Sequence, residues 1–178
     1  MKMTPAKRKI IHALEELLMQ HDLDDIYVSD IVRLSEVSRK TFYRHFQDKY
    51  ELVNFYFLDF YSNTFEKIVE GEKWEEALYN YLCICEEKAL VLIHAYSSRD
   101  TNCLRKYDIE MTEKTYQKYL LLKSVDINTK EMSFAIRIAA SGGTDMIIEW
   151  IKSGMKENKT TLVELIKRTL PQDILQNF

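Results

Sequence analysis

The spacing of apolar side chains along this chain is helical almost from end to end. Near the start, Ile10, Leu14 and Leu18 recur at every fourth position, which places them on one face of a helix. Thr4 and Pro5 precede them and are typical of a helix start, because a hydroxyl caps free backbone N–H groups and proline has no N–H to leave unpaired. No window longer than five residues alternates cleanly between apolar and polar positions, so the pattern predicts an all-α fold.

The same spacing predicts further helices, separated by short polar stretches. Three of them follow a residue that is suited to capping a helix start, namely Ser29, Ser38 and Asp48. Pro171 is expected to end the last helix. With the first helix, this gives a fold of about eight or nine helices. The later helices are expected at about residues 29–34, 38–46, 49–69, 74–96, 103–123, 129–155 and 160–170.

Composition agrees with a helical fold that buries a sizeable core. The chain has 178 residues, 46% of them hydrophobic, and only 4 Gly and 2 Pro, which disfavours a sandwich or barrel with many tight turns. The net charge of −3 is unevenly distributed. Residues 33–49 carry five basic and two acidic side chains, whereas residues 51–178 carry 16 basic and 20 acidic side chains. A small basic region on an acidic body favours an anionic partner such as nucleic acid.

The sequence lacks the residues that are characteristic of several classes of protein. The odd number of cysteines, Cys83, Cys85 and Cys103, contains no Cys-x-x-Cys pair and argues against a disulfide framework. With no Gly-rich phosphate loop and no closely spaced histidine pair, we expect no enzyme activity, no metal and no cofactor, although a redox sensor at Cys103 is an alternative. The N-terminus does not resemble a signal peptide, and Ala89–Ile93 is an apolar run of only five residues, so we expect a cytoplasmic protein without membrane contact.

Residues 28–46 carry most of the functional information. Two short helices joined by three or four residues have the spacing of a helix-turn-helix, in which the second helix enters the major groove of DNA. Its basic and hydroxyl side chains suit phosphates and base edges. A structural helical hairpin with a solvated charged face would give the same pattern. The expected core is Ile31, Val32, Val37, Phe42 and Phe46, and the outward residues are Arg39, Lys40, Thr41, Tyr43, Arg44 and His45.

The segment Ser35–Leu52 resembles the signature of the TetR family of transcriptional regulators. It reads Ser-Glu-Val-Ser-Arg-Lys-Thr-Phe-Tyr-Arg-His-Phe, followed by a lysine and a leucine, with the aromatic, histidine and lysine positions in the family's register. The resemblance implies an N-terminal three-helix DNA-binding domain over residues 1–48. Glu36 departs from the family pattern, because glycine is frequent at this position, and a positive φ here would strain a residue with a side chain.

The resemblance implies that nine residues bind DNA. Arg39 and Lys40, early in the second helix of the motif, are expected to contact base edges. Partial burial of Tyr43, and a solvated or capping role for His45, are the alternatives at those two positions. The remaining residues are Ser29 and Ser38 at helix starts, Thr41, Tyr43, His45 and Lys49 at phosphates, and Arg44 at either kind of contact.

The resemblance also implies a C-terminal helical domain, residues 49–178, that dimerises and binds an effector. Separately, the helix predicted over 129–155 has two apolar stripes, so it needs a partner besides its own core. With the last helix it would form a four-helix bundle across a two-fold axis. Burial of both helices inside one chain is the alternative. The expected interface residues are Ile136, Ala140, Gly143, Ile147, Ile151, Leu162 and Ile166.

Aromatic residues are numerous in this C-terminal part, and in TetR-like proteins such residues line the ligand cavity. A flat or amphipathic organic effector would suit a pocket rich in tyrosine. Packing of the same residues into an ordinary core is the alternative. The candidate pocket residues are Tyr56, Phe60, Tyr79, Cys83, Tyr96, Tyr107, Met111 and Trp150.

These expectations combine into one function. We expect a homodimeric repressor that binds a palindromic double-stranded DNA operator and is released by a small organic effector. The two recognition helices of such a dimer would lie about 34–36 Å apart, one helical turn of DNA. Residues 143–155 also resemble a TetR subgroup that includes regulators of dihydroxyacetone kinase operons, one of which is an activator with a protein partner. An activator or interaction regulator of the same fold, controlled by a protein partner, is therefore the alternative.

Overall fold

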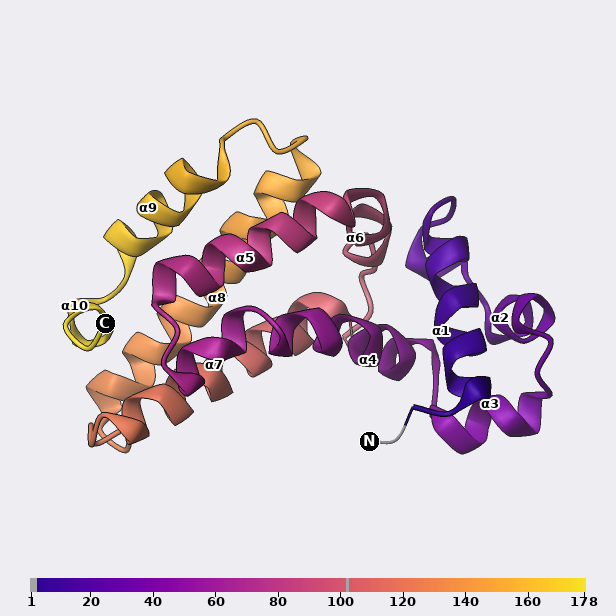
Figure 1. Cartoon of the computed structure of the whole chain (residues 1–178), viewed down its shortest axis with the longest axis horizontal. Coiled ribbons are helices and arrows are strands. Elements are labelled where there is room, and N and C mark those ends of the chain that lie inside the picture. The colour runs from indigo at the N-terminus through magenta and orange to yellow at the C-terminus, as the bar shows by residue number, and fades with distance from the viewer. Residues whose placement is uncertain (1–2, 102) are drawn as a thin grey trace. The chain divides into compact units, whose positions relative to one another are not determined.

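The computed structural model describes residues 3–101 and 103–178 of the chain (Figure 1). Every regular element in these two ranges is helical, which confirms the all-α expectation. The chain forms two compact units. The first contains the described residues up to Asp59 together with Lys88–Leu104, and the second contains Phe60–Glu87 and Arg105–Phe178. The boundary expected at residue 48 separates a DNA-binding domain from an effector-binding domain. It differs from the division into compact units and remains a prediction.

The first unit is built around α1 (Pro5–Leu18), whose apolar face is buried. The helix starts as predicted, because the Thr4 hydroxyl accepts a hydrogen bond from the backbone N–H of Lys7 at 3.2 Å. A short 3-10 helix, η1 (Leu23–Asp25), follows α1 in the chain. The helices that pack against α1 are α2 (Val28–Ser35), α3 (Arg39–His45) and α6 (Ala89–Ala95).

One charged side chain lies in the core of this unit. Lys7 is 1% exposed, and its Nζ atom lies 3.5 Å from the ring centroid of Phe55 and 5.0 Å from that of Phe46. Burial lowers the pKa of Lys7, and the Glu51 carboxylate acts against this change. The cation–π contacts join α1 to the residues that follow α3, and so help to hold the three N-terminal helices together.

Residues 88–104 return to the first unit and are tied to it by polar contacts. These contacts join α6 and the turn after it to α1 and the loop that precedes α2. The unit is therefore assembled from two separate stretches of the chain. The contacting pairs are Lys88 Nζ with Glu15 Oε1 at 2.8 Å, His94 Nδ1 with Asp22 Oδ1 at 2.6 Å, and Ser98 Oγ with Asp24 Oδ1 at 2.5 Å.

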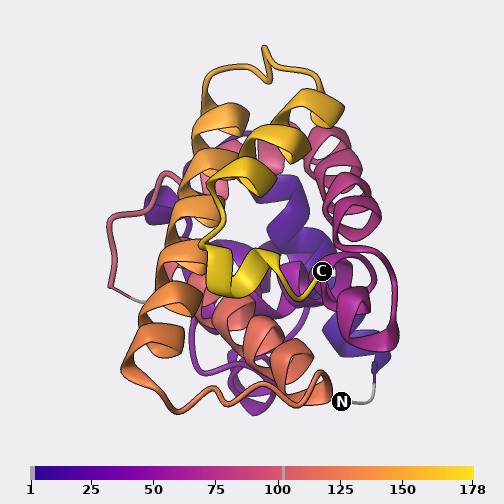
Figure 2. The ribbon, with the colours of Figure 1, turned by 90° about the vertical axis from the view of Figure 1, so that its left-hand side faces the viewer.

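The second unit packs its helices around an aromatic core. The Trp74 indole N–H donates to the Tyr116 hydroxyl at 3.1 Å, and the ring of Phe65 meets both rings edge-on. α5 packs against α8 and α9, and α9 and α10 follow one side of α8 (Figure 2). The bounds are α5 (Trp74–Glu87), α7 (Leu104–Leu122), α8 (Lys130–Lys152), α9 (Lys159–Thr169) and α10 (Gln172–Leu175).

Two predicted helices are interrupted in the structure. The helix expected over 49–69 ends as α4 (Lys49–Ser62), and its remainder is the 3-10 helix η2 (Phe65–Glu70). The Thr64 hydroxyl donates to the carbonyl of Phe60 at 2.5 Å, and side-chain bonds of this kind compete with the helical backbone. The helix expected over 74–96 divides at Lys88 into α5 and α6, where the chain leaves the second unit for the first.

Candidate nucleic-acid interface

The connection between α2 and α3 is a tight turn. α2 ends at Glu36, which adopts a left-handed conformation with φ 54° and ψ 30°. A residue with a Cβ atom is strained there, so the penalty expected for a residue other than glycine is present. α3 begins after Ser38, whose hydroxyl accepts a hydrogen bond from the Thr41 N–H at 3.1 Å. The predicted cap at Ser38 is therefore confirmed.

α2 starts earlier than predicted. Tyr27 occupies the N-cap position, and its backbone N–H donates to a carboxylate oxygen of Asp30 at 3.1 Å. The other carboxylate oxygen of Asp30 accepts a hydrogen bond from Arg33, also at 3.1 Å. Ser29 lies inside the first turn and is exposed, so the prediction that its hydroxyl caps the helix is wrong. That hydroxyl remains available to a partner on the surface.

α3 presents a cationic face outward and an aromatic side chain inward. Phe42 is completely buried, whereas Arg39, Lys40 and Arg44 are exposed and Tyr43 is 56% exposed. Residues four apart lie on the same side of a helix, so the exposed side chains form two adjacent rows. None of the three cations forms an ion pair with another residue that the structure describes.

Two other residues of α3 are less accessible than predicted. Thr41 is half-buried, and its hydroxyl oxygen lies 3.0 Å from the hydroxyl oxygen of Ser38. His45 is also half-buried, and its Nε2 atom is buried without a hydrogen-bond partner in the described part of the chain. A phosphate contact by His45 would therefore have to use Nδ1, the other ring nitrogen.

Lys49 is directed toward the protein rather than toward a partner. Its Nζ atom donates to the backbone carbonyls of Leu23 at 2.6 Å, Asp24 at 3.1 Å and Ile26 at 2.8 Å. An ammonium group has three N–H bonds, so these carbonyls use all of them. Burial lowers the pKa of Lys49, and nearby carboxylates, Asp24 foremost, act against this change. These contacts favour a structural role for Lys49, and its contact with phosphate stays a prediction.

The predicted dimer interface lies mostly inside the second unit. Six of its seven residues are at most 8% exposed in the single chain. A Cβ atom at the seventh, Gly143, would lie 3.9 Å from Ile166 Cγ2, so this position also faces α9. Their burial favours the alternative that they pack within one chain, and their contact with a second copy stays a prediction. The six residues are Ile136, Ala140, Ile147, Ile151, Leu162 and Ile166.

A second apolar row of α8 is exposed instead. Phe134 is 70% exposed, Ile138 is 50% exposed and Met146 is 48% exposed, and Gly142 lies in the same row at intervals of four residues. Leu165 of α9 is 48% exposed. Exposed apolar side chains in one row are typical of a surface that contacts another protein. The two apolar stripes that the sequence indicated, which include Ala135 and Ile136, are largely buried, so this exposed row is one that the sequence analysis did not identify.

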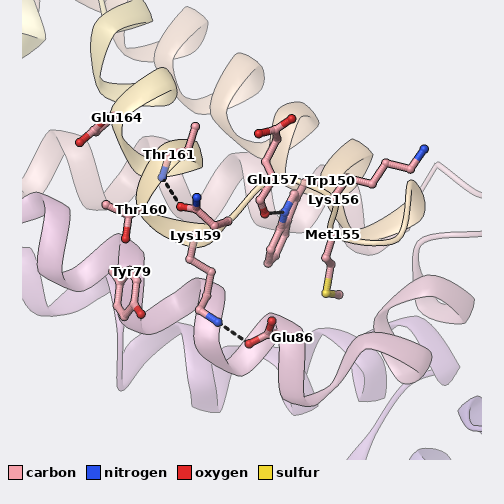
Figure 3. A pocket seen from close by; sticks show the side chains of 11 residues that line it. Tyr79, Glu86, Trp150, Met155, Lys156, Glu157, Lys159, Thr160, Thr161 and Glu164 are labelled. Atoms are coloured by element: carbon pink, nitrogen blue, oxygen red, sulfur yellow. Dashed lines mark hydrogen bonds and ion pairs between the residues drawn. The ribbon is translucent and has the colours of Figure 1, made fainter.

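Two of the predicted effector-pocket residues line one hollow of the second unit. Tyr79 and Trp150 border a space of about 710 Å³ beside the start of α9 (Figure 3). In the first unit, Tyr56 donates to Glu15 Oε1 at 2.8 Å, and Tyr96 stacks on Phe57 with ring centroids 6.4 Å apart. The candidates of the second unit that do not line this hollow are Phe60, Cys83, Tyr107 and Met111.

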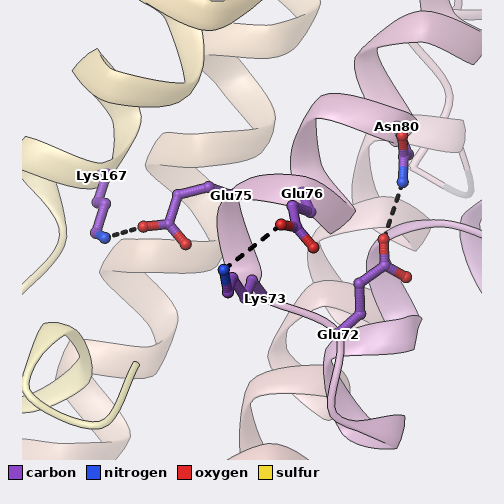
Figure 4. A network of polar contacts seen from close by, with 6 residues as sticks. All are labelled: Glu72, Lys73, Glu75, Glu76, Asn80 and Lys167. Atoms are coloured by element: carbon purple, nitrogen blue, oxygen red, sulfur yellow. Dashed lines mark hydrogen bonds and ion pairs between the residues drawn. The ribbon is translucent and has the colours of Figure 1, made fainter.

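Some of the polar groups around this hollow contact one another. The Trp150 indole N–H donates to the Glu157 carbonyl at 2.7 Å, and Lys159 forms an ion pair with Glu86 (Figure 3). An adjoining hollow of about 640 Å³ between α5 and α9 is bordered by further paired groups (Figure 4). These pairs are Lys167 with Glu75, Lys73 with Glu76 at 3.7 Å, and Asn80 with Glu72 at 2.9 Å.

Neither a metal-binding cluster nor a membrane-spanning helix is found in the described residues. No group of three or more His, Cys, Asp or Glu side chains within residues 3–101 and 103–178 could hold a metal ion. Over the same ranges, no helix combines the length and the apolar character needed to span a membrane.

Comparison with known proteins identifies both parts of the chain. Residues 72–172 match a family model described as "Transcriptional regulator C-terminal region", and residues 10–54 match one described as "Bacterial regulatory proteins, tetR family". No curated protein matches the sequence significantly.

Solved structures resemble the fold over most of its length. A TetR transcriptional regulator from Streptococcus agalactiae 2603V is 20% identical, with a TM-score of 0.68 and 94% of each chain covered. A structure titled "Dihydroxyacetone kinase operon activator DhaS" is 21% identical, with a TM-score of 0.62 and coverage of 93% of this chain and 94% of the other. The fatty acid degradation regulator FadR from Bacillus halodurans is 16% identical, with a TM-score of 0.60 and 96% of each chain covered.

Proposed function

The chain belongs to the TetR family and is a DNA-binding transcriptional regulator, and from this premise we propose that it represses transcription as a homodimer on a palindromic operator. A small organic effector then releases it from DNA. The operator contacts come from α3 and from the exposed hydroxyl of Ser29 at the start of α2. These are the sequence-specific and backbone contacts, respectively, that a helix-turn-helix makes.

The cationic outer face of α3 is the observation that carries this proposal. Arg39, Lys40 and Arg44 are exposed and without ion-pair partners among the described residues, around a buried Phe42 that fixes the helix. Arginine donates two parallel hydrogen bonds to guanine, and both arginine and lysine bind phosphate. Three unneutralised cations on so short a helix are best satisfied by a polyanion, because binding also releases condensed counterions from DNA.

The proposed dimer forms through the exposed row of α8. Phe134, Ile138 and Met146 supply the apolar contacts, Gly142 lets a second helix approach closely, and Leu165 extends the surface onto α9. A self-complementary surface of this kind gives a two-fold symmetric dimer, and a two-fold axis matches a palindrome. This places the interface on a different stripe of α8 from the one that the sequence indicated.

Fluorescence anisotropy with the DNA upstream of the gene, titrated with salt, tests the proposal. The wild type should bind this DNA more tightly than an unrelated duplex, and its affinity should fall steeply as salt increases. Lys114→Ala, at an exposed lysine of α7 in the second unit, is the matched control and should bind as the wild type does. Equal affinity for both duplexes at every salt concentration would refute sequence-specific binding.

A second candidate function is activation under the control of a protein partner. It is supported by the similarity to the structure titled as the activator DhaS, at 21% identity over nearly the whole chain. Transcript levels in a strain that lacks the gene decide between the two: they rise if the protein represses and fall if it activates.

A further inference from the structure

We propose that Tyr27 contacts the DNA backbone and that Lys49 is the residue that positions it. The proposal rests on the proposed function, since it concerns the same DNA-binding surface. It assigns the phosphate contact to an uncharged phenol that precedes α2. It also removes that contact from the lysine at the start of α4.

Lys49 binds the backbone of the loop that precedes α2. Its three hydrogen bonds end on the carbonyls of Leu23, Asp24 and Ile26, which together form the last turn of η1 and the residue after it. The closest of these contacts, at 2.6 Å, is as short as charge-assisted hydrogen bonds become. Because the ammonium is saturated, a phosphate oxygen could bind it only if at least one of these bonds broke.

Tyr27, the residue after Ile26, presents its side chain to solvent. It is 65% exposed, and its ring centroid lies 5.8 Å from the Lys49 Nζ atom. Its backbone N–H is bound to the Asp30 carboxylate, so the residue is fixed between Lys49 on one side and α2 on the other. An exposed aromatic side chain on a fixed backbone loses little conformational entropy when it binds a partner.

The position of Tyr27 in the motif favours a phosphate as its partner. In a helix-turn-helix the first helix crosses the DNA backbone, and Tyr27 begins that helix, α2. The phenol O–H is one of the side-chain donors that commonly bind phosphate oxygens. The surrounding loop carries Asp22, Asp24 and Asp25, so the charge of Lys49 also offsets carboxylates that would otherwise repel DNA.

The salt dependence of binding separates positioning by Lys49 from a direct phosphate contact. Lys49→Met should lower operator affinity by roughly tenfold while the slope of log affinity against log salt stays that of the wild type. Lys40→Ala is the control for a cation at the DNA and should reduce that slope by about one. Lys49→Arg keeps the charge but not the compact three-donor group, so it should also lose affinity. A Lys49→Met slope reduced by about one, with Lys49→Arg binding normally, would overturn the positioning role.

Tyr27 is tested by removing only its hydroxyl. Tyr27→Phe should weaken binding by about three- to tenfold, the usual worth of one hydrogen bond, with an unchanged salt slope. In the Lys49→Met background the same substitution should have little further effect, because the loop no longer holds the phenol in place. Wild-type affinity in Tyr27→Phe would exclude the phosphate contact, and fully additive losses would exclude the dependence on Lys49.

A measurement without DNA keeps the test independent of the proposed function. In Lys49→Met, amide hydrogen exchange should accelerate at Ile26 and Tyr27, while the amide of Phe42, bonded to the Ser38 carbonyl in α3, should keep its protection. Unchanged exchange at Ile26 and Tyr27 would overturn the role of Lys49. If the wild type fails to bind any DNA, the proposed function and the role of Tyr27 fall together, but the exchange result still decides the role of Lys49.

Discussion

The outward faces of α3 and α8 differ in chemistry, although both helices have the same backbone geometry. α3 exposes Arg39, Lys40 and Arg44, whereas α8 exposes a row of apolar residues that includes Phe134 and Ile138. A cationic face is soluble on its own and gains free energy by meeting a polyanion, but an apolar face gains free energy by leaving water. The exposed stripe of a helix, rather than its buried one, therefore indicates what the helix can bind.

The largest effect is expected from a charge in the apolar row. Ile138→Glu would bury an unpaired carboxylate in the proposed dimer, which we expect to weaken association by about 2–5 kcal/mol, or at least thirtyfold. Sedimentation velocity measures the change. Leu121→Glu is the control: it places the same charge at an exposed apolar residue of α7 and should leave the dimer intact. A dimer that survives the first substitution and not the second would place the interface on α7.

Substitutions on the cationic face should affect DNA and not assembly. Arg39→Ala and Lys40→Ala should each cost about 1–3 kcal/mol of operator binding and relax the preference for particular bases, if these side chains read base edges. Binding to a panel of operators with single base-pair changes measures this, and sedimentation should show an unchanged dimer. A uniform loss over all sequences would reassign the two residues to phosphate contacts.

A substitution in the buried stripe of α8 should lower the stability of the fold rather than weaken the dimer or DNA binding. Gly143→Leu forces extra methylene groups toward Ile166, and overpacking of this kind typically costs about 1–3 kcal/mol of folding free energy. Urea denaturation should show that loss. At urea concentrations where the variant is folded, the dissociation constant of its dimer should equal that of the wild type. A weaker dimer with an unchanged free energy of unfolding would instead show that the buried stripe forms the dimer interface.

The smallest effect is expected at the turn that joins the two short helices. Glu36→Gly removes the strain of a left-handed residue but adds the flexibility of glycine to the unfolded chain, which leaves a net gain of about 0.5–1 kcal/mol. Thermal unfolding measures the gain. A loss of stability instead would show that the Glu36 side chain contributes more than its backbone strain costs.

The parts of the fold that depend on local chemistry could be predicted from the sequence. A hydroxyl before a helical pattern marks the starts at Thr4 and Ser38, since a cap needs only a side chain and an N–H three residues away. The start of α2 was missed because Tyr27 rather than Ser29 is the N-cap residue, and the carboxylate of Asp30 inside the helix accepts the Tyr27 N–H. The break near Thr64 was missed because the apolar spacing continues through it.

The parts that depend on contacts between distant residues could not be predicted. Apolar residues occur on more than two sides of α8, so only its packing against α5, α9 and α10 shows that Ile136 is interior and that Ile138 is exposed. The carbonyls that bind Lys49 lie more than twenty residues earlier in the chain, and backbone acceptors leave no trace in a sequence. The nine DNA-binding residues therefore remain a prediction, and at Lys49 we propose a positioning role in place of the expected phosphate contact.

The return of residues 88–104 to the first unit has a practical consequence for anyone who wishes to dissect the molecule. The polypeptide passes from one unit to the other three times, after Asp59, after Glu87 and after Leu104. A fragment truncated at residue 48 or 59 would lack α6, and α1 would lose one of the helices that cover it. The DNA-binding helices therefore cannot be separated from the rest of the chain by a single cut without losing α6. For the same reason, they cannot be fused intact to another protein through one linker.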